Sequence, residues 1–407
     1  MYRGNPHLTG VVQSSGLRHF HQVKWEVEGW FAVHLPLVAS QDLIYATWLT
    51  GMQVEIHAIE KETGTLRWRW KPGQNEFAGQ AHLHLEQGML YYPVRAAQPP
   101  PGSDGAFLYA FDVQTGQVLR RISIPLLPNR AMFNQFTMHD GVVYLYGMRG
   151  NAPGGDQYFC AAVDLQTEQL LWMTDLGVRL YSPSPVAAHG MVYLQTYDQP
   201  APRYRTPMHL HALNAQTGGL VWEYESQRGP VRDFAVAGTD LFFLSESGLE
   251  VIDALGGTRK WNWTSQGLMP NDSPTITDEF VYLSSKGRCS VIKTEPDLVG
   301  EEEIWTGEMV VLERATKQQR WRGEANEGQD STNGAIVAGE LLYAVWKQLD
   351  TRPAAINATL FVLDLRTGQE YWRFDAAQLS TPLVTDGNVF LVRGQGEGTN
   401  TFLCALA

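Results

Sequence analysis

Residues 360–372 read Leu-Phe-Val-Leu-Asp-Leu-Arg-Thr-Gly-Gln-Glu-Tyr-Trp, a pattern that predicts a β-hairpin. Apolar residues dominate the first strand, the Thr-Gly pair suits a tight turn, and the second strand ends on Trp372. The same pattern recurs at residues 56–68, 108–120, 160–172, 210–222, 249–261 and 309–321. Seven copies of one hairpin identify a repeat protein.

The spacing between copies indicates the size of the repeat. The closing residues lie between 39 and 60 residues apart, which is too long for a two-stranded unit. A second recurrent element, an apolar strand, a glycine turn and another apolar strand, lies between the hairpins, for example at residues 185–194 and 382–391. Each repeat therefore holds four strands, which is one blade of a β-propeller.

The two ends of the chain predict how the ring closes. Residues 401–407 match the third strand of a blade and residues 23–27 match a fourth strand, with Trp25 lying 43 residues before Trp68. We therefore expect an all-β, eight-bladed propeller of four-stranded antiparallel blades, in which the N-terminal strand completes the last blade. Seven blades with a frayed tail are the alternative. The expected single domain spans residues 1–407, with a lead-in at 1–22, the closing strand at 23–28 and the remaining blades at 29–407.

The hairpin resembles the tryptophan-docking motif of the PQQ-like (quinoprotein-type) β-propeller repeat family. Residues 1–10, Met-Tyr-Arg-Gly-Asn-Pro-His-Leu-Thr-Gly, look like the segment that opens such propellers, so the resemblance covers essentially the whole chain. It implies that each docking residue packs against the next blade. The positions concerned are Trp25, Trp68, Trp172, Trp222, Trp261, Trp321 and Trp372. Arg120 departs from the motif, and a looser contact is expected there.

Composition limits the classes of partner and compartment. The formal net charge of −12 opposes binding to a phosphate backbone, so no nucleic acid is expected. No stretch approaches the ~20 apolar residues of a membrane helix, and residues 1–30 lack a basic segment followed by an apolar one. The resemblance favours a periplasmic or cell-surface protein whose signal or anchor was removed; otherwise it is cytoplasmic. Cys160, Cys289 and Cys404 imply no disulfide framework.

The irregular residues concentrate in one slot of the repeat, between the second and third strands of a blade. The insertions lie at residues 96–106, 147–158, 197–208, 293–308, 347–359 and 394–400. In a propeller this slot opens on a single face, so we expect that looped face to meet a ligand or partner. Residues 294–303 form an acidic run, expected either as a solvated loop or as a docking site for a basic partner or a weak cation site.

Polar residues near the start of the innermost strands are candidates for a ligand site in the central funnel. They are His34, His82, Asn134, Arg232, Asp233, Asp272 and Asn333, with Asp330 and Thr381 close by. Such groups suit a small polar ligand or a hard cation, and the alternative is a water-filled channel with ordinary polar lining. His82 and His84 would share one face of a strand and so could contribute to a metal site, although no metal is expected.

The function expected first is a noncatalytic scaffold that binds a protein or peptide partner on the looped face. Blade number and length resemble BamB-like propellers, and no catalytic residues or cofactor are expected. The alternatives are a PQQ-dependent, calcium-containing dehydrogenase or a sensor propeller that binds a small ligand or carbohydrate. The dehydrogenases in this family carry an adjacent cysteine pair, which this sequence lacks. The propeller is expected to be monomeric.

Overall fold

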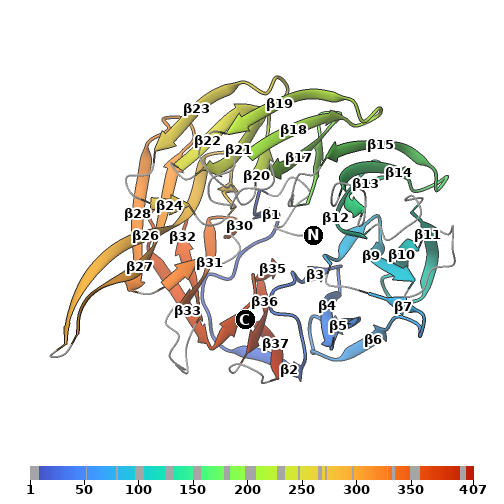
Figure 1. Ribbon diagram of the computed structural model, residues 1–407. Coiled ribbons are helices and arrows are strands. Elements are labelled where there is room, and N and C mark those ends of the chain that lie inside the picture. The colour runs from blue at the N-terminus through green and yellow to red at the C-terminus, as the bar shows by residue number, and fades with distance from the viewer. Residues whose placement is uncertain are drawn as a thin grey trace.

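A ring of eight antiparallel sheets forms the structure (Figure 1). This computed structural model describes residues 9–51, 53–78, 81–96, 105–124, 132–149, 157–177, 184–197, 208–226, 234–245, 248–264, 268–270, 273–295, 298–327, 329–331, 335–348, 358–394 and 400–407. Within these residues every regular element is a β-strand. The eight-bladed propeller predicted from the sequence is confirmed, and the seven-bladed alternative is wrong.

The first four blades follow one another along the chain. Blade 1 contains β3 (Val38–Ala39), β4 (Leu43–Thr50), β5 (Gln53–Glu60) and β6 (Leu66–Trp70). Blade 2 contains β7 (Glu76–Phe77), β8 (His84–Glu86), β9 (Met89–Ala96), β10 (Ala106–Asp112) and β11 (Val118–Ser123). Blade 3 contains β12 (Met132–His139), β13 (Val142–Arg149), β14 (Gln157–Asp164) and β15 (Leu170–Gly177). Blade 4 contains β16 (Val186–Ala188), β17 (Met191–Tyr197), β18 (Met208–Asn214) and β19 (Leu220–Ser226).

The other four blades complete the ring. Blade 5 contains β20 (Phe234–Ala237), β21 (Asp240–Ser245), β22 (Gly248–Asp253) and β23 (Arg259–Thr264). Blade 6 contains β24 (Leu268–Pro270), β25 (Thr275–Ile276), β26 (Phe280–Glu295), β27 (Leu298–Glu313) and β28 (Gln319–Glu327). Blade 7 contains β29 (Gln329–Ser331), β30 (Ile336–Ala338), β31 (Leu341–Gln348), β32 (Ala358–Asp364) and β33 (Glu370–Ala376). Blade 8 contains β34 (Gln378–Leu379), β35 (Leu383–Thr385), β36 (Asn388–Gly394), β37 (Thr401–Leu406) and β2 (Val23–Gly29).

Blade 8 closes the ring with strands from both ends of the chain. β2 pairs antiparallel with β37, from Val23 opposite Leu406 to Gly29 opposite Thr401. In Figure 1 the blue β2 therefore lies beside the red strands of blade 8. The predicted closing strand is confirmed, and it extends one residue further than expected.

Indole N–H groups tie most blades to the next one. Each of these tryptophans lies on the fourth strand of its blade, and its ring lies across the boundary to the next blade. Its indole N–H donates a hydrogen bond to a backbone carbonyl in the turn between the third and fourth strands of that next blade. The pairs are Trp25 with Lys61 (2.8 Å), Trp68 with Val113 (2.9 Å), Trp172 with Ala215 (2.8 Å), Trp222 with Ala254 (3.0 Å) and Trp321 with Leu365 (2.8 Å). At all five of these boundaries the ring lies against a glycine with positive φ.

Two boundaries use different chemistry. Arg120 forms an ion pair of 2.9 Å with Glu168, the turn residue that stands where five other blades have glycine. The looser contact expected at this boundary from the sequence stays a prediction. The second of these boundaries joins blades 5 and 6, where the Lys317 ammonium lies 5.8 Å from the centre of the Trp261 ring.

The core consists of layers of apolar side chains between neighbouring blades. One layer joins blades 4 and 5 through Tyr193, Leu210, Phe234 and Phe243, all of which are completely buried. Cys160 and Cys404 are buried free thiols within such layers. Burial raises the pKa of Cys160 to about 12, which keeps this thiol protonated and unreactive at neutral pH. In the described part of the chain there is no helix long and apolar enough to cross a membrane.

Candidate functional site

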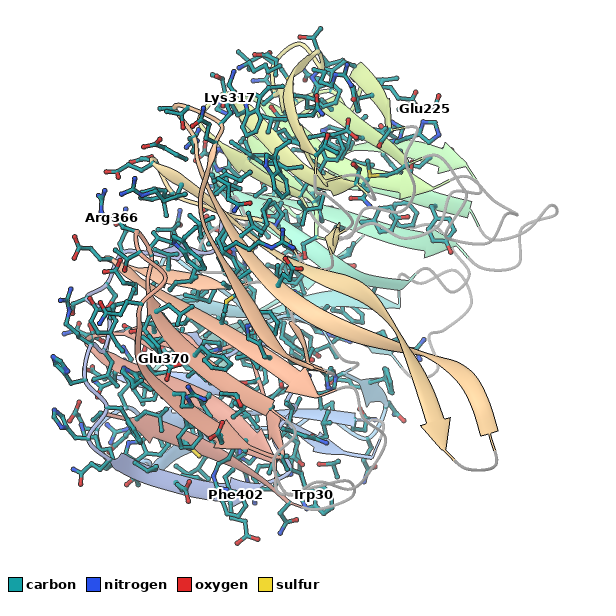
Figure 2. The ribbon with its side chains drawn as sticks, turned by 90° about the vertical axis from the view of Figure 1, so that its left-hand side faces the viewer. Trp30, Glu225, Lys317, Arg366, Glu370 and Phe402 are labelled. Carbon is teal, nitrogen blue, oxygen red and sulfur yellow. The ribbon has the colours of Figure 1, made fainter. Side chains whose placement is uncertain are left out.

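The two faces of the ring differ in construction. The turns between third and fourth strands lie on one face, and the connections between second and third strands leave the other. Figure 2 shows the turn residues Lys317 and Arg366 on one side of the ring, with a long hairpin extending from the opposite side. The described strands that flank the predicted insertions end at this second face, here named the looped face. Residues 97–104, 150–156, 198–207, 349–357 and 395–399 of these insertions lie outside the described residues.

The hairpin that leaves the looped face belongs to blade 6 and is here named the arm. β26 and β27 pair without interruption through sixteen positions, from Phe280 opposite Glu313 to Glu295 opposite Leu298. The solvated loop expected at residues 294–303 is therefore wrong, because residues 294–295 and 298–303 lie in strands. Val291 and Ile292 pair with Glu302 and Glu301, and these facing β-branched residues favour strands where the acidic composition alone suggested a loop. Cys289 also lies within β26, rather than near its end.

Only the base of the arm is covered by further strands. On one side β24 pairs with β26 as far as Leu268 opposite Gly287. On the other side β28 pairs with β27 as far as Glu327 opposite Thr306. Beyond these points, from Arg288 opposite Trp305 to the tip, the described strands have no third neighbour.

Trp30 is an exposed aromatic residue at the looped end of blade 8. It follows β2 directly, and 51% of its surface is exposed to solvent. Its backbone carbonyl accepts a hydrogen bond of 2.8 Å from the Leu49 N–H, which joins this position to blade 1. A large ring on an anchored backbone suits contact with a partner, because aromatic side chains dominate binding energy at interfaces.

The structure describes part of the predicted funnel. His34 is exposed and His82 is partly buried, and desolvation of the ring is the main cause that lowers the pKa of His82 to about 4. His82 is therefore neutral at pH 7. Asn134 and Asp330 lie in β12 and β29, and the backbone carbonyl of Thr381 accepts a hydrogen bond from the Ser380 hydroxyl. Arg232, Asp233, Asp272 and Asn333 lie outside the described residues.

The predicted His82 and His84 pair does not occupy one strand, because β8 begins at His84. His84 instead lies 3.3 Å from the Glu86 carboxylate and packs near Phe136 of the next blade. Nowhere among the described side chains do three His, Cys, Asp or Glu groups gather in a way that could hold a metal ion. A calcium-bound quinone needs several oxygen ligands.

No sequence signal indicated that the lead-in segment pairs with a blade of the ring. β1 (Val11–Val12) pairs in parallel with β30 at the inner edge of blade 7. Gly10 has a φ of +76°, and a Cβ atom there would lie 2.8 Å from the Ala335 carbonyl oxygen. Glycine is thus required for the close approach of this strand. The inner edge of blade 7 is covered by this contact.

The described part of this segment, residues 9–22 with β1 included, is here named the strap. The Leu17 carbonyl accepts a hydrogen bond of 2.9 Å from the Trp372 indole, and the Phe20 ring stacks on Trp372 at 5.3 Å. Gln22 and Ala407 exchange two backbone hydrogen bonds of 3.1 Å. The strap thus takes the place that the following turn occupies at other boundaries. The strap therefore joins blades 7 and 8 on the turn face, through Trp372 and through its backbone bonds to Ala407.

A buried polar cluster between blades 3 and 4 also escaped sequence reasoning. The His209 ring lies 2.7 Å from the Glu223 carboxylate, and the Thr196 hydroxyl lies 2.8 Å from the His211 ring. The His-x-His spacing on β18 was the available signal. Thr196, His209 and His211 are at most 6% exposed, so these groups support the blade boundary and do not meet a ligand.

An eight-bladed propeller with docking tryptophans and an open looped face is the class of protein that these features define. The chain belongs to the family whose model is described as outer membrane protein assembly factor BamB, which matches residues 161–348 and 306–403. No curated protein matches the sequence closely enough to count as a relative.

Solved structures of known proteins share the fold. A quinohemoprotein alcohol dehydrogenase from Pseudomonas putida is 13% identical with a TM-score of 0.67, covering 100% of this chain and 80% of that one. A europium-containing methanol dehydrogenase is 11% identical with a TM-score of 0.70, covering 100% and 97%. BamB from Moraxella catarrhalis is 15% identical with a TM-score of 0.56, covering 95% and 99%. At these identities the likeness shows the fold alone, and it spans both scaffolds and enzymes.

Proposed function

We propose that this protein is a noncatalytic scaffold that binds a protein or peptide partner on its looped face. The difference between the two faces carries this proposal. The turn face consists of short hydrogen-bonded turns and the strap, whereas the looped face carries the arm and the exposed Trp30. A rigid ring that presents protruding backbone and an aromatic anchor suits macromolecular recognition.

The family match supports the same function, because its description names an assembly factor. Such a factor works with other proteins rather than on a small substrate. We further propose that the protein acts in the periplasm or at the cell surface, by analogy with the outer-membrane role that this description names.

Site-specific photo-crosslinking tests the choice of face. A photoreactive p-benzoylphenylalanine replaces Trp30 on the looped face or, as the matched control, Lys317 on the turn face; Figure 2 labels both. We expect the probe at position 30 to capture a partner that mass spectrometry identifies and that the purified proteins bind again. Capture from position 317 alone would contradict the assignment of the face.

Calorimetric titration with pyrroloquinoline quinone, with and without calcium, tests the alternative of an enzyme. A noncatalytic scaffold needs no quinone, so the proposal predicts no heat of binding and no change in the quinone absorbance. Tight one-to-one binding that depends on calcium would favour a dehydrogenase and sink the noncatalytic proposal.

A further inference from the structure

The outer half of the arm is a two-stranded ribbon with open edges. Its eight outer residue pairs, from Arg288 opposite Trp305 to Glu295 opposite Leu298, have no third strand among the described residues. Each open edge presents backbone N–H and C=O groups that no neighbouring strand satisfies. Figures 1 and 2 show this part of the arm standing clear of the ring.

A ribbon of this kind gains stability from a third strand. Isolated two-stranded hairpins are marginal in water, and three or more strands are generally needed for independent stability. The outer arm contains the β-branched residues Val291, Ile292 and Ile304, which favour strands. Strand addition would satisfy the open edge, so the arm is built to receive an extended segment.

The charges of the two strands differ and select one edge. Residues 298–305 of β27 read Leu-Val-Gly-Glu-Glu-Glu-Ile-Trp and contain no basic residue. The facing part of β26 carries Arg288 and Lys293. Opposite charges on neighbouring strands contribute roughly 0.2–1 kcal/mol per pair, and like charges are destabilising. The edge of β27 therefore favours a basic strand, and the net charge of −12 assists its approach.

We propose that the outer half of β27 accepts a basic, extended segment of a partner protein as a third strand of the arm. This inference rests on the proposed function, since it identifies the element of the looped face that binds and the chemistry of the partner. Main-chain hydrogen bonds supply the pairing, and Glu301, Glu302 and Glu303 select lysine or arginine on the added strand. A segment that alternates basic and β-branched residues suits this edge.

Peptide binding to the intact protein tests this proposal. The probe is a fluorescent octapeptide of alternating lysine and valine, and the control probe has glutamate in place of lysine. We expect the lysine peptide to bind in low salt and its binding to weaken strongly in about 0.5 M salt, because salt screens the attraction between the glutamates and the lysines. Equal binding of both peptides, or binding of neither, would overturn the proposal.

Two variants locate the binding edge. In the first, an Asn-Gly turn replaces residues 288–305, which removes the outer arm but keeps the pairs that β24 and β28 cover. In the second, Glu301→Lys, Glu302→Lys and Glu303→Lys reverse the charge of the edge. We expect affinity for the lysine peptide to fall by about tenfold or more in both variants, and the second variant to prefer the glutamate peptide. Unchanged affinity in the first variant would exclude the arm.

Hydrogen exchange distinguishes strand addition from loose electrostatic contact. If a third strand forms, alternate amides within residues 298–305 become protected when the lysine peptide binds. Binding without such protection would overturn the strand geometry. Failure of this inference is separable from failure of the proposed function: crosslinking from position 30 that persists in the arm-trimmed variant would retain the looped face and exclude the arm.

Discussion

Blade 3 meets its two neighbours through different chemistry. Towards blade 4, Trp172 is 8% exposed and donates to the Ala215 carbonyl, while its ring lies against Gly218. Towards blade 2, the turn of blade 3 carries Glu168, and the half-exposed Arg120 side chain forms an ion pair of 2.9 Å with it. One boundary is held by a buried aromatic ring, and the other by two half-exposed charges.

The difference shows that the docking residue and the turn residue are matched as a pair. Trp172 needs glycine beneath its ring, because a Cβ atom at position 218 would lie 2.5 Å from this ring. Where the turn carries Glu168 instead, the docking position carries a residue of opposite charge. The Trp261 boundary combines tryptophan with Lys317 through a cation–π contact. Where one blade departs from the tryptophan and glycine pair, the facing residue of the next blade therefore supplies a different favourable contact.

The largest effect is expected from removing the buried ring. Trp172→Ala should lower the free energy of unfolding by roughly 3–5 kcal/mol, because it creates a cavity at the boundary. Arg120→Ala is the matched change at the other boundary and should cost only about 0.2–1 kcal/mol, since exposed ion pairs are weak. Urea unfolding measures both. Similar costs for the two variants would break the distinction between the boundaries.

The next largest loss of stability is expected at Gly218, where a control separates the steric clash with Trp172 from the backbone strain of a positive φ. Gly218→Ala should destabilise by roughly 1–3 kcal/mol, because alanine is strained at a φ of +70° and its Cβ would clash with Trp172. Gly88→Ala is the control, since Gly88 has a φ of +75° but no neighbouring atom within 4 Å of an added Cβ. Thermal and urea unfolding of both should show the greater loss for position 218. If the two losses are equal, the close contact with the ring contributes nothing.

A double-mutant cycle tests the pairing directly. Arg120→Trp and Glu168→Gly together convert one boundary to the chemistry of the other. Arg120→Trp alone places an indole against Glu168, and Glu168→Gly alone leaves Arg120 without its partner. We expect a favourable coupling of about 1 kcal/mol between the changes, within the range usual for residues in contact. Additive effects would show that the two positions are independent.

The smallest effect concerns the turn of blade 3. The Asp164 carboxylate accepts hydrogen bonds from the backbone N–H and the hydroxyl of Thr167, and these bonds lower its pKa. Since the folded pKa lies below the unfolded one, this stabilisation is present above about pH 4 and disappears as the pH falls through the folded value.

Asp164→Asn tests this contribution by copying the blade 4 turn. There the Asn214 side chain accepts the equivalent bond from the Thr217 N–H and does not titrate. We expect little change at neutral pH and a smaller loss of stability on acidification, measured by urea unfolding at neutral and acidic pH. An identical acid sensitivity in both proteins would assign the effect to other carboxylates.

The sequence predicted the ring because the repeat carries local signals. Alternating apolar residues, Thr-Gly turns and the terminal tryptophan specify each hairpin before any long-range contact forms. The same reasoning placed the closing strand, residues 23–28, in blade 8, because a fourth strand that no third strand precedes in the chain must pair with the third strand at the other end. It failed for the arm, where Glu301, Glu302 and Glu303 resemble a solvated loop although the backbone pairs along the whole segment.

The candidate site was predicted less completely because its parts come from distant segments. The sequence indicated the looped face, because the irregular residues are concentrated between the second and third strands of each repeat. It gave no means of seeing that Trp30 stays exposed or that the strap covers the inner edge of blade 7. The expectation that His82 and His84 share one strand was wrong, because β8 begins at His84.

By itself the sequence determined the number of blades, the order of strands and the closure of the ring, because each repeat encodes its own hairpins and leaves one strand missing. The tertiary structure alone decided how neighbouring blades match, as at Arg120 with Glu168, and where the strap runs. It also decided which strand edges stay open on the arm. These properties depend on side chains and backbone that come together only when the blades pack, so no local pattern records them.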